Sequence, residues 1–389
     1  MSSDLRKEYT RVVWLRYQNA NKKKKGLILD EFCATRCINR KYAIRLFSKV
    51  PTHFKNRPGR KKTYSDHAVY HLRRLWILLN QMNSKRLKEA LPYWLCFYVA
   101  SAEVKAELLV MSPATMDRKL AQFRATVARR RRSGTKPGSL IKNIIPIKPF
   151  DFEIRQPGHV EADTVAHCGG SLAGNFIWSL TFTDIFSGWT ENRAVWGKGS
   201  KGVVDAIREI EKLLPFGILS FNSDNGSEFL NYHLIRYFGP EGEKKRHHQL
   251  MTRSREYKKN DNAHVEQKNW THVREVFGYD RFSNPDQVEL MNHVYREEHS
   301  LLHNFFYPQM KLKTKVRVGS RYKRTYTKAM TPYQRILACE HVSPEAKDRL
   351  TTLFKTLNPF KLRQQMQQKF KEFYNAQKPV PDEQPKQAA

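Results

Sequence analysis

Acidic residues are scarce in this chain of 389 residues: 37 Asp and Glu stand against 70 Lys and Arg, a formal net charge of +33. Such a surplus indicates a polyanionic partner, most commonly nucleic acid, although a ribosomal-type protein or a membrane-surface binder shows the same excess. Residues 151–280 are nearly neutral, with 16 basic and 18 acidic side chains, whereas residues 1–150 have 34 and 9. We therefore predict a central catalytic domain between basic nucleic-acid-binding segments.

Cysteines and long apolar runs are also few. The five cysteines are scattered and odd in number, as in proteins of a reducing compartment without a disulfide framework. The pairs Cys33/Cys37 and His67/His71 do not have zinc-finger spacing, so we interpret the cysteines as core residues. No apolar run approaches the roughly 20 residues of a membrane span, and a charged segment opens the chain. These features predict a cytoplasmic protein without a membrane partner.

Residues 1–60 have the pattern of a basic helix-turn-helix domain. We expect one helix over residues 5–19, a break at Lys22–Gly26, and two further helices, the second of which is capped by Asn39. An ordinary basic three-helix bundle is the alternative. The expected inward residues are Leu27, Leu29, Phe32, Cys33, Ala43, Ile44 and Phe47, and the expected DNA-facing residues are Arg40, Lys41 and Arg45.

Residues 61–134 predict a second helical DNA-binding unit, followed by a linker over residues 135–150. A helix from Ser84 should stop at Ala90, before Pro92, and Ser112-Pro113 should open another helix. Further DNA-binding candidates in and before this unit are Arg60, Lys61, Lys62, Arg118, Lys119 and Arg124.

Residues 151–285 alternate between strand and helix patterns and predict a mixed five-stranded α/β sheet. The expected strands are residues 160–167, 176–185, 190–196, 217–224 and 247–252, and the expected helices are residues 200–215, 228–238 and 262–277. The whole chain is thus predicted to be a multidomain α/β protein.

Three carboxylates in this domain call for a chemical explanation. Asp163 lies in the middle of a strand, where Asp is rare. Asp224 ends the fourth strand, at the edge where α/β proteins bind ligands, although Asp-Asn-Gly is also an ordinary turn sequence. Glu266 shares a helical face with Ala263, Trp270, Val273 and Phe277, so we expect it to be buried and either paired, protonated or bound to a metal.

Carboxylates from two strands and a helix can converge at one sheet edge and hold two Mg²⁺ or Mn²⁺ ions. Such a pair activates a water or a 3′-hydroxyl and stabilises the leaving oxygen of a phosphodiester. Asn262, one turn before Glu266, is a candidate supporting residue, and Glu228 is a rival to Asp224. We rank Asp184, Glu191 and Asp205 lower.

The segments ADTV, SDNGSEF and NDNAHVEQKNW, which contain Asp163, Asp224 and Glu266, resemble the Asp-Asp-Glu triad of the retroviral-integrase superfamily. They are most similar to bacterial insertion-sequence transposases with the integrase catalytic core. The resemblance covers residues 155–280. It implies an RNase H-like fold, divalent metal, cleavage of transposon-end DNA and strand transfer into target DNA.

The chain departs from this family in two places. The 41 residues between Asp224 and Glu266 are somewhat more than is typical, which indicates an insertion near Gly239–Arg246. Trp270 and Val273 stand where retroviral integrases have basic residues, so DNA contacts are expected instead from Lys268, His272 or Arg274.

After the core, residues 286–377 predict helices around a basic, β-prone segment, either a small barrel, an extended DNA-contacting segment or a linker, and residues 378–389 predict a disordered tail. We therefore expect a DNA transposase that acts on double-stranded terminal inverted repeats and target DNA as a homodimer or larger assembly. The alternatives are a catalytically inactive DNA-binding regulator and a related nuclease without strand transfer.

Overall fold

The computed structural model describes residues 3–49, 63–124, 154–197, 199–223, 229, 232–240, 250–253 and 263–377. The chain divides into two compact units, Met1–Tyr64 and Ser65–Ala389, and each is described by itself. Within the described ranges, no helix combines the length and the apolar character that a membrane span requires.

The first unit consists of α1 (Ser3–Gln18), α2 (Lys22–Arg36) and α3 (Arg40–Phe47) around one small core. The Asn39 side chain accepts a hydrogen bond from the Lys41 backbone N–H at 2.9 Å, so the predicted cap of the last helix is confirmed. Its buried residues are Val13, Ile28, Leu29, Phe32, Ala43 and Phe47.

Two expectations for this unit are wrong. Asn21 caps α2, so the helix begins at Lys22 and Gly26 lies within it. Leu27 and Ile44 are exposed, at 66% and 46%. The inward side of α2 is centred on Ile28, Leu29 and Phe32; because successive residues of an α-helix are about 100° apart, Leu27 is rotated out of the core.

The second unit opens with α4 (Asp66–Leu78), α5 (Ser84–Leu95), α6 (Ala102–Val110) and α7 (Pro113–Arg124). Ser112 Oγ accepts the Thr115 N–H at 3.2 Å, as the Ser-Pro start of α7 predicts. The expected end of α5 before Pro92 is wrong, because the helix continues to Leu95. Trp94 and Leu95 are buried there, and their packing outweighs the backbone hydrogen bond that proline removes.

A mixed five-stranded sheet forms the centre of the second unit, as predicted. Its strands are β1 (His159–Ala166), β2 (Ile177–Asp184), β3 (Thr190–Trp196), β4 (Ser220–Ser223) and β5 (Met251–Arg253). The order is β3-β2-β1-β4-β5; β1 is antiparallel to β2 and parallel to β4, and β4 is parallel to β5.

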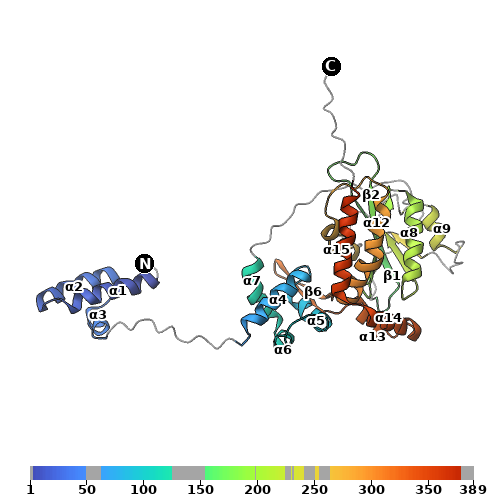
Figure 1. Ribbon diagram of the computed structural model, residues 1–389. Coiled ribbons are helices and arrows are strands. Elements are labelled where there is room, and N and C mark those ends of the chain that lie inside the picture. Colours follow the sequence, from blue (N-terminus) through green and yellow to red (C-terminus); the bar gives the residue numbers. More distant parts are fainter. Residues whose placement is uncertain are drawn as a thin grey trace, which may run out of the picture. The chain divides into compact units, whose positions relative to one another are not determined.

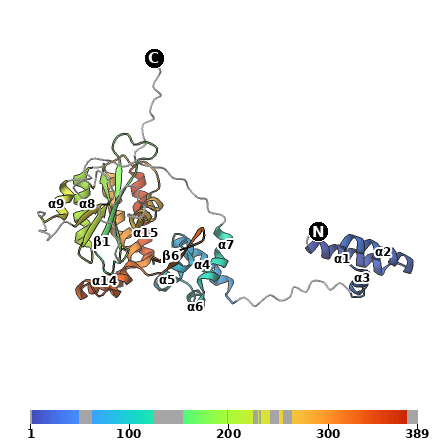
Figure 2. The ribbon, with the colours of Figure 1, turned by 180° about the vertical axis from the view of Figure 1, so that it is seen from behind.

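Helices pack on both faces of the sheet because alternate strand residues point to opposite sides. Phe182 and Phe221 face α9 (Tyr232–Phe238), where the Phe221 and Phe238 rings stack at 4.4 Å, and α8 (Ser200–Leu213) packs against β3. In Figure 2, α8 and α9 lie next to each other, beside the sheet in which β1 is labelled.

The other face is covered by a long, segmented helix and by the C-terminal helices. The segmented helix comprises α10 (Ala263–Lys268), the π-helix η1 (Asn269–Arg274) and α11 (Glu275–Phe277). It is followed by α12 (Gln287–His293), the π-helices η2 (Val294–His299) and η3 (Leu302–Phe306), and later by α15 (Pro359–Asn375). Figure 1 shows α12 and α15 running side by side.

The residues after 285 therefore complete the core of the sheet, and the boundary expected at residue 285 does not separate two cores. Phe282, Met291, Tyr295 and Phe373 share one buried cluster with Ile177 of β2.

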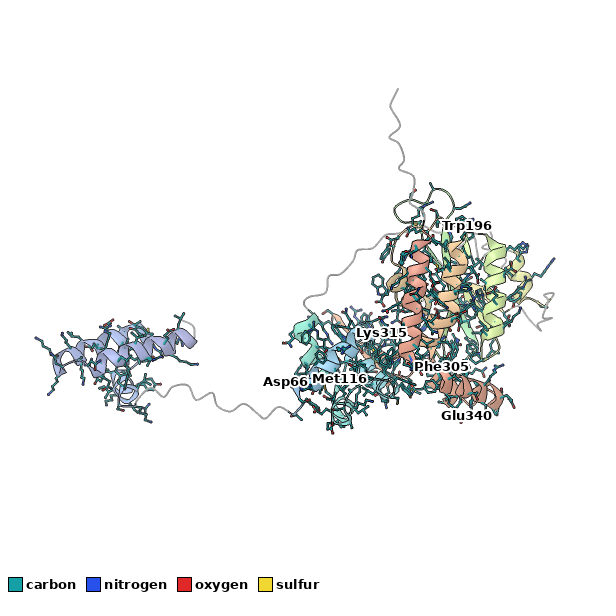
Figure 3. The ribbon with its side chains drawn as sticks, in the orientation of Figure 1. Asp66, Met116, Trp196, Phe305, Lys315 and Glu340 are labelled. Atoms are coloured by element: carbon teal, nitrogen blue, oxygen red, sulfur yellow. The ribbon has the colours of Figure 1, made fainter. Side chains whose placement is uncertain are left out.

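The same C-terminal region also contacts α5. Trp94 donates from Nε1 to the Phe306 carbonyl at 3.3 Å, and its ring stacks on Tyr307. Residues 66–124 thus share an apolar contact with η3. Close by, Phe305 of η3, labelled in Figure 3, packs against Tyr333 and Phe354, from α13 (Pro332–Ala338) and α14 (Pro344–Thr356).

The basic, β-prone segment forms an exposed antiparallel hairpin of β6 (Leu312–Val318) and β7 (Arg321–Tyr326). Gly319 has a φ of 59° in its turn, a conformation that glycine adopts readily. Every side chain of the two strands is exposed, so the hairpin offers cations to solvent on both faces; Lys315 is labelled in Figure 3.

Candidate functional site

The segmented helix α10–η1–α11 is tied to β1 by hydrogen bonds from two acidic residues of the strand. Glu161, 1% exposed, accepts the Val265 N–H at 3.0 Å. Two residues further on, and on the same face of the strand, Asp163 Oδ2 accepts from Asn269 Nδ2 at 2.6 Å. These two contacts bracket Glu266 in the helix. The structure thus brings the helix of Glu266 against the strand of Asp163.

The same alignment continues along β1. Arg274 donates from Nη2 to the Ala166 carbonyl at 3.0 Å, and the ring of Phe277 lies 6.2 Å from that of His167. The helix and the strand therefore run in the same direction, with successive helical turns facing successive strand residues.

Asp163 is half-buried and held in a fixed orientation. Its Oδ1 accepts the Thr164 N–H at 2.7 Å while its Oδ2 accepts the Asn269 amide. Asn269 Oδ1 is buried beside it and has no hydrogen-bond partner among the described residues. A buried acceptor with no protein donor is what a hydrated cation next to the carboxylate would satisfy.

Glu266 is exposed, so the expectation of a buried glutamate is wrong. Trp270, expected on the same buried face, is 43% exposed, whereas Val273 and Phe277 are fully buried. The cause is the π-helical segment η1, in which each turn takes up more residues than an α-helical turn. The spacing of 3 and 4 residues therefore does not keep Glu266 on the face of Val273 and Phe277.

The third carboxylate of the predicted triad is Asp224, which lies outside the described residues, as do Asn262, Glu228, Arg60, Lys61 and Lys62. The described part of β4 ends at the residue before Asp224. That residue, Ser223, pairs with Ala162, the residue before Asp163.

The lower-ranked acids have structural partners. Buried Asp184 accepts hydrogen bonds from the Gly158 N–H at 2.8 Å and from the N–H and hydroxyl of Ser187. Burial raises the pKa of Asp184. These donors fix the turn after β2, so Asp184 has a structural role there.

Glu191 is buried in a similar way. It accepts from Trp189 Nε1 at 2.9 Å and from Ser300 Oγ at 2.7 Å, and burial raises its pKa. It therefore joins β3 to the C-terminal helices. Asp205 is on the surface of α8, where it pairs with Arg208 at 2.9 Å.

The residues expected to contact DNA after Glu266 point inward. Lys268 is 8% exposed and donates to Gln309 Oε1 at 2.7 Å, and burial lowers its pKa well below the usual value. His272 is 1% exposed, and Arg274 is bonded to the Ala166 carbonyl. Lys268 ends α10, and His272 lies in η1 with its ring against those of His299 and His303.

Lys268 lines a cavity of about 400 Å³. The cavity opens between α5, η1 and η3 and is predominantly polar. Its lining includes Arg86, Lys268, His272, Glu275, His303 and Gln309.

Apart from Lys268, the described DNA-binding candidates on helices lie at or near the surface. Arg40, Lys41 and Arg45 are exposed on α3, where Arg40 pairs with Asp30. On α7, Arg118 is exposed and Lys119 half-buried, whereas Arg124 binds Asp117 and Ser84. Arg124 is thus engaged within its own helical unit.

Sequence reasoning missed Glu161 and Asn269. Two signals could have revealed them: Glu161 lies two residues before Asp163 and so on the same strand face, and Asn269 lies about one turn after Glu266. The donors at this site are oxygens of carboxylates and of an amide, the hard ligands that suit Mg²⁺ or Mn²⁺.

A search against models of known protein families gives no match for this chain. The chain is similar to the uncharacterized protein y4rM of Sinorhizobium fredii (strain NBRC 101917 / NGR234), with 33% identity over 344 residues. The similarity covers 86% of this chain and 96% of the relative. Because the likeness extends over nearly the whole of both chains, the protein belongs to the same family as y4rM.

Proposed function

We propose that this protein is a DNA transposase of the Asp-Asp-Glu type, which cleaves transposon-end DNA and joins the freed 3′-hydroxyl to target DNA. The observation that carries the proposal is the hydrogen bond from Asn269 to Asp163, because it fixes the helix of Glu266 against the strand of Asp163. It thereby places an aspartate of the central strand next to a helix with an exposed glutamate, and carboxylate oxygens are the ligands that Mg²⁺ prefers.

The arrangement of the sheet supports the same proposal. Three antiparallel strands followed by two parallel ones, in the order β3-β2-β1-β4-β5 with helices on both faces, are what an RNase H-like core would have. In such a core the ends of β1 and β4 are neighbours, and here Ala162 pairs with Ser223. Asp163 and Asp224 directly follow these two residues in the sequence.

In this proposal Asp163, Asp224 and Glu266 hold divalent metal, Mg²⁺ or Mn²⁺, with two ions per site. The ions supply Lewis acidity to the attacking and leaving oxygens of a phosphodiester. Asn269 keeps the Asp163 carboxylate in one orientation through Oδ2, and Glu161 holds the start of α10 through the Val265 N–H. Both are positioning residues, since they act through the carboxylates and the helix.

The cationic surfaces would bind the DNA. In the first unit, exposed Arg40, Lys41 and Arg45 lie on α3, the second helix of the proposed helix-turn-helix. In the second unit, the β6–β7 hairpin presents Lys313, Lys315, Arg317, Arg321, Lys323 and Arg324, all exposed. Joining two transposon ends to one target requires two active sites, so we propose that a homodimer or larger assembly acts on double-stranded DNA.

The test uses the full chain and a plasmid that carries the genomic DNA flanking its gene, with Mg²⁺ or Mn²⁺. Wild-type protein should nick or cut within the flanking DNA and join ends bearing a free 3′-hydroxyl to a second plasmid. Asp163→Asn, Asp224→Asn and Glu266→Gln should each lower both activities by at least about 100-fold, as expected when a group that stabilises transition-state charge is lost. Asp205→Asn is the matched control, because Asp205 is an exposed acid of the same domain.

The outcomes separate this proposal from its alternatives. Wild-type binding without any cleavage identifies a DNA-binding regulator, and cleavage without joining identifies a nuclease. Full activity in all three carboxylate variants contradicts the site assignment. If Glu228→Gln loses cleavage activity while Asp224→Asn keeps it, the role proposed for Asp224 belongs to Glu228.

A further inference from the structure

Three histidines from three π-helical segments meet on the inner side of the segmented helix. His272 comes from η1, His299 from the end of η2 and His303 from η3. One ring nitrogen of each lies within 4.8 Å of one ring nitrogen of both others. π-helical segments are rare and occur frequently at functional sites. Three of them at one histidine cluster therefore call for an explanation.

The hydrogen bonding of these imidazoles is incomplete. His272 and His299 are each 1% exposed, yet His272 Nδ1 and His299 Nε2 have no hydrogen-bond partner among the described residues. A buried ring nitrogen with no partner is costly. Here two such nitrogens occur in one cluster, where a bound ion would satisfy both.

The surroundings favour the ligating form of the side chains. Burial lowers the pKa of His299 to about 3 and the pKa values of His272 and His303 well below 6.5. Neutral imidazole is the form that binds transition metals, whereas Mg²⁺ prefers oxygen.

We propose that His272, His299 and His303 form a binding site for a divalent transition metal, with Zn²⁺ as the fitting ion. Three imidazoles with a fourth, exchangeable ligand are an established zinc coordination set. The site is separate from the carboxylates of the proposed active site and does not depend on that proposal.

The cavity beside the cluster supplies the fourth ligand. His272 and His303 line it, whereas His299 lies behind them. Arg86 lines the same cavity, and its positive charge disfavours a bare cation. The fourth ligand is therefore an anion, hydroxide or another solvent anion, which offsets the charge of the metal.

The ion has a structural consequence. His272 belongs to the helix of Glu266, whereas His299 and His303 belong to the helix that follows α12. A metal bound to all three clamps these two helices together, three residues beyond the Asn269–Asp163 contact.

The test uses the full chain stripped with a chelator and titrated with Co²⁺, the spectroscopic substitute for Zn²⁺, in excess Mg²⁺ to occupy oxygen sites. Wild-type protein should bind one Co²⁺ per chain, with visible absorption typical of nitrogen and oxygen ligands and no thiolate charge-transfer band. His299→Gln and His303→Gln should weaken Co²⁺ binding by about 100-fold or more. Removing a residue that only orients a metal ligand already lowers metal affinity by about 10–100-fold. His293→Gln is the control, since His293 is exposed and pairs with Glu289.

Zn²⁺ should also raise the Tm of wild-type protein and of Asp163→Asn, but not the Tm of His303→Gln. The proposal is overturned if wild-type protein shows no visible Co²⁺ bands, or if the bands persist in both histidine variants. A thiolate band would assign the metal to the cysteines and would equally overturn it. If a variant fails to fold, a wild-type spectrum without visible Co²⁺ bands, or with a thiolate band, still overturns the proposal.

Discussion

The two sides of the helix over residues 263–277 differ in chemistry although they share one backbone. The outer side carries exposed Glu266 and meets half-buried Asp163 of the central strand through Asn269, so its donors are oxygens. The inner side carries Lys268 and His272, which are buried and have lowered pKa values. Charged oxygens near solvent suit hard cations, whereas neutral buried nitrogens suit softer ones.

The π-helical segment η1 separates these two sides. It begins at Asn269, the residue that touches Asp163, and it contains His272. A regular α-helix would have placed Glu266, Trp270, Val273 and Phe277 on one side. Instead, Glu266 and Trp270 are exposed while Val273 and Phe277 are buried. Because the helical pitch changes at η1, Glu266 is exposed to solvent while Val273 and Phe277 stay in the core.

The largest effect should come from the buried side. Phe277→Ala should lower the free energy of unfolding by about 3–5 kcal/mol, because it empties a fully buried site packed against Tyr295 and Phe373. Trp270→Ala should lower the free energy of unfolding by about 1 kcal/mol or less, since Trp270 is 43% exposed. Urea unfolding of both variants measures the contrast. Equal costs would show that the two residues share one face and that the helix is regular.

An intermediate effect is expected at the contact between the helix and Asp163. Under the proposed function, Asn269→Ala should lower DNA cleavage by about 10–100-fold, as is usual when a residue that orients a metal ligand is removed. Substrate binding should stay unchanged, since the Asn269 amide is bonded to the Asp163 carboxylate. Steady-state cleavage kinetics give both values. The control is Gln267→Ala, because Gln267 is an exposed amide on the same helix. An equal loss of cleavage activity in Gln267→Ala would show that Asn269 has no particular role in orienting Asp163.

The last effect concerns pH and is the smallest when it is counted per pH unit. Burial lowers the pKa of His167, beneath Phe277, to about 3, whereas the unfolded chain has the ordinary value of 6.5. The unfolded state therefore binds the proton first as pH falls. Stability that is complete above pH 6.5 should be lost toward pH 3, at up to about 1.4 kcal/mol per pH unit.

His167→Gln should make this dependence less steep, because glutamine does not titrate in that range, whereas the other buried histidines still do. Urea unfolding at a series of pH values measures the slope, with the exposed His293→Gln as the comparison. If wild-type and His167→Gln proteins lose stability in parallel as pH falls, the histidine is already accessible to protons in the folded state.

Several local features were predictable because they depend on neighbouring residues only. Asn39 caps α3, Ser112-Pro113 opens α7, and the five strands follow their apolar and β-branched residues. The start of α2 at Lys22 depends on an equally local signal, the Asn21 cap, although a break was expected there. The passage of α5 through Pro92 was not predictable, because tertiary packing of Trp94 overrode the local preference.

The sequence by itself determined the strongly basic charge, the strand and helix order of the core and the three carboxylates that stand out in it. Only the tertiary structure decided that residues after 285 complete the same core, that Glu266 is exposed, and that Asn269 reaches Asp163. The histidine cluster belongs to this second group as well, since His272 lies 27 residues from His299 in the sequence. Charge and periodicity are properties of single residues and short windows, whereas π-helical pitch and long-range contacts result from the packing of whole helices against the sheet.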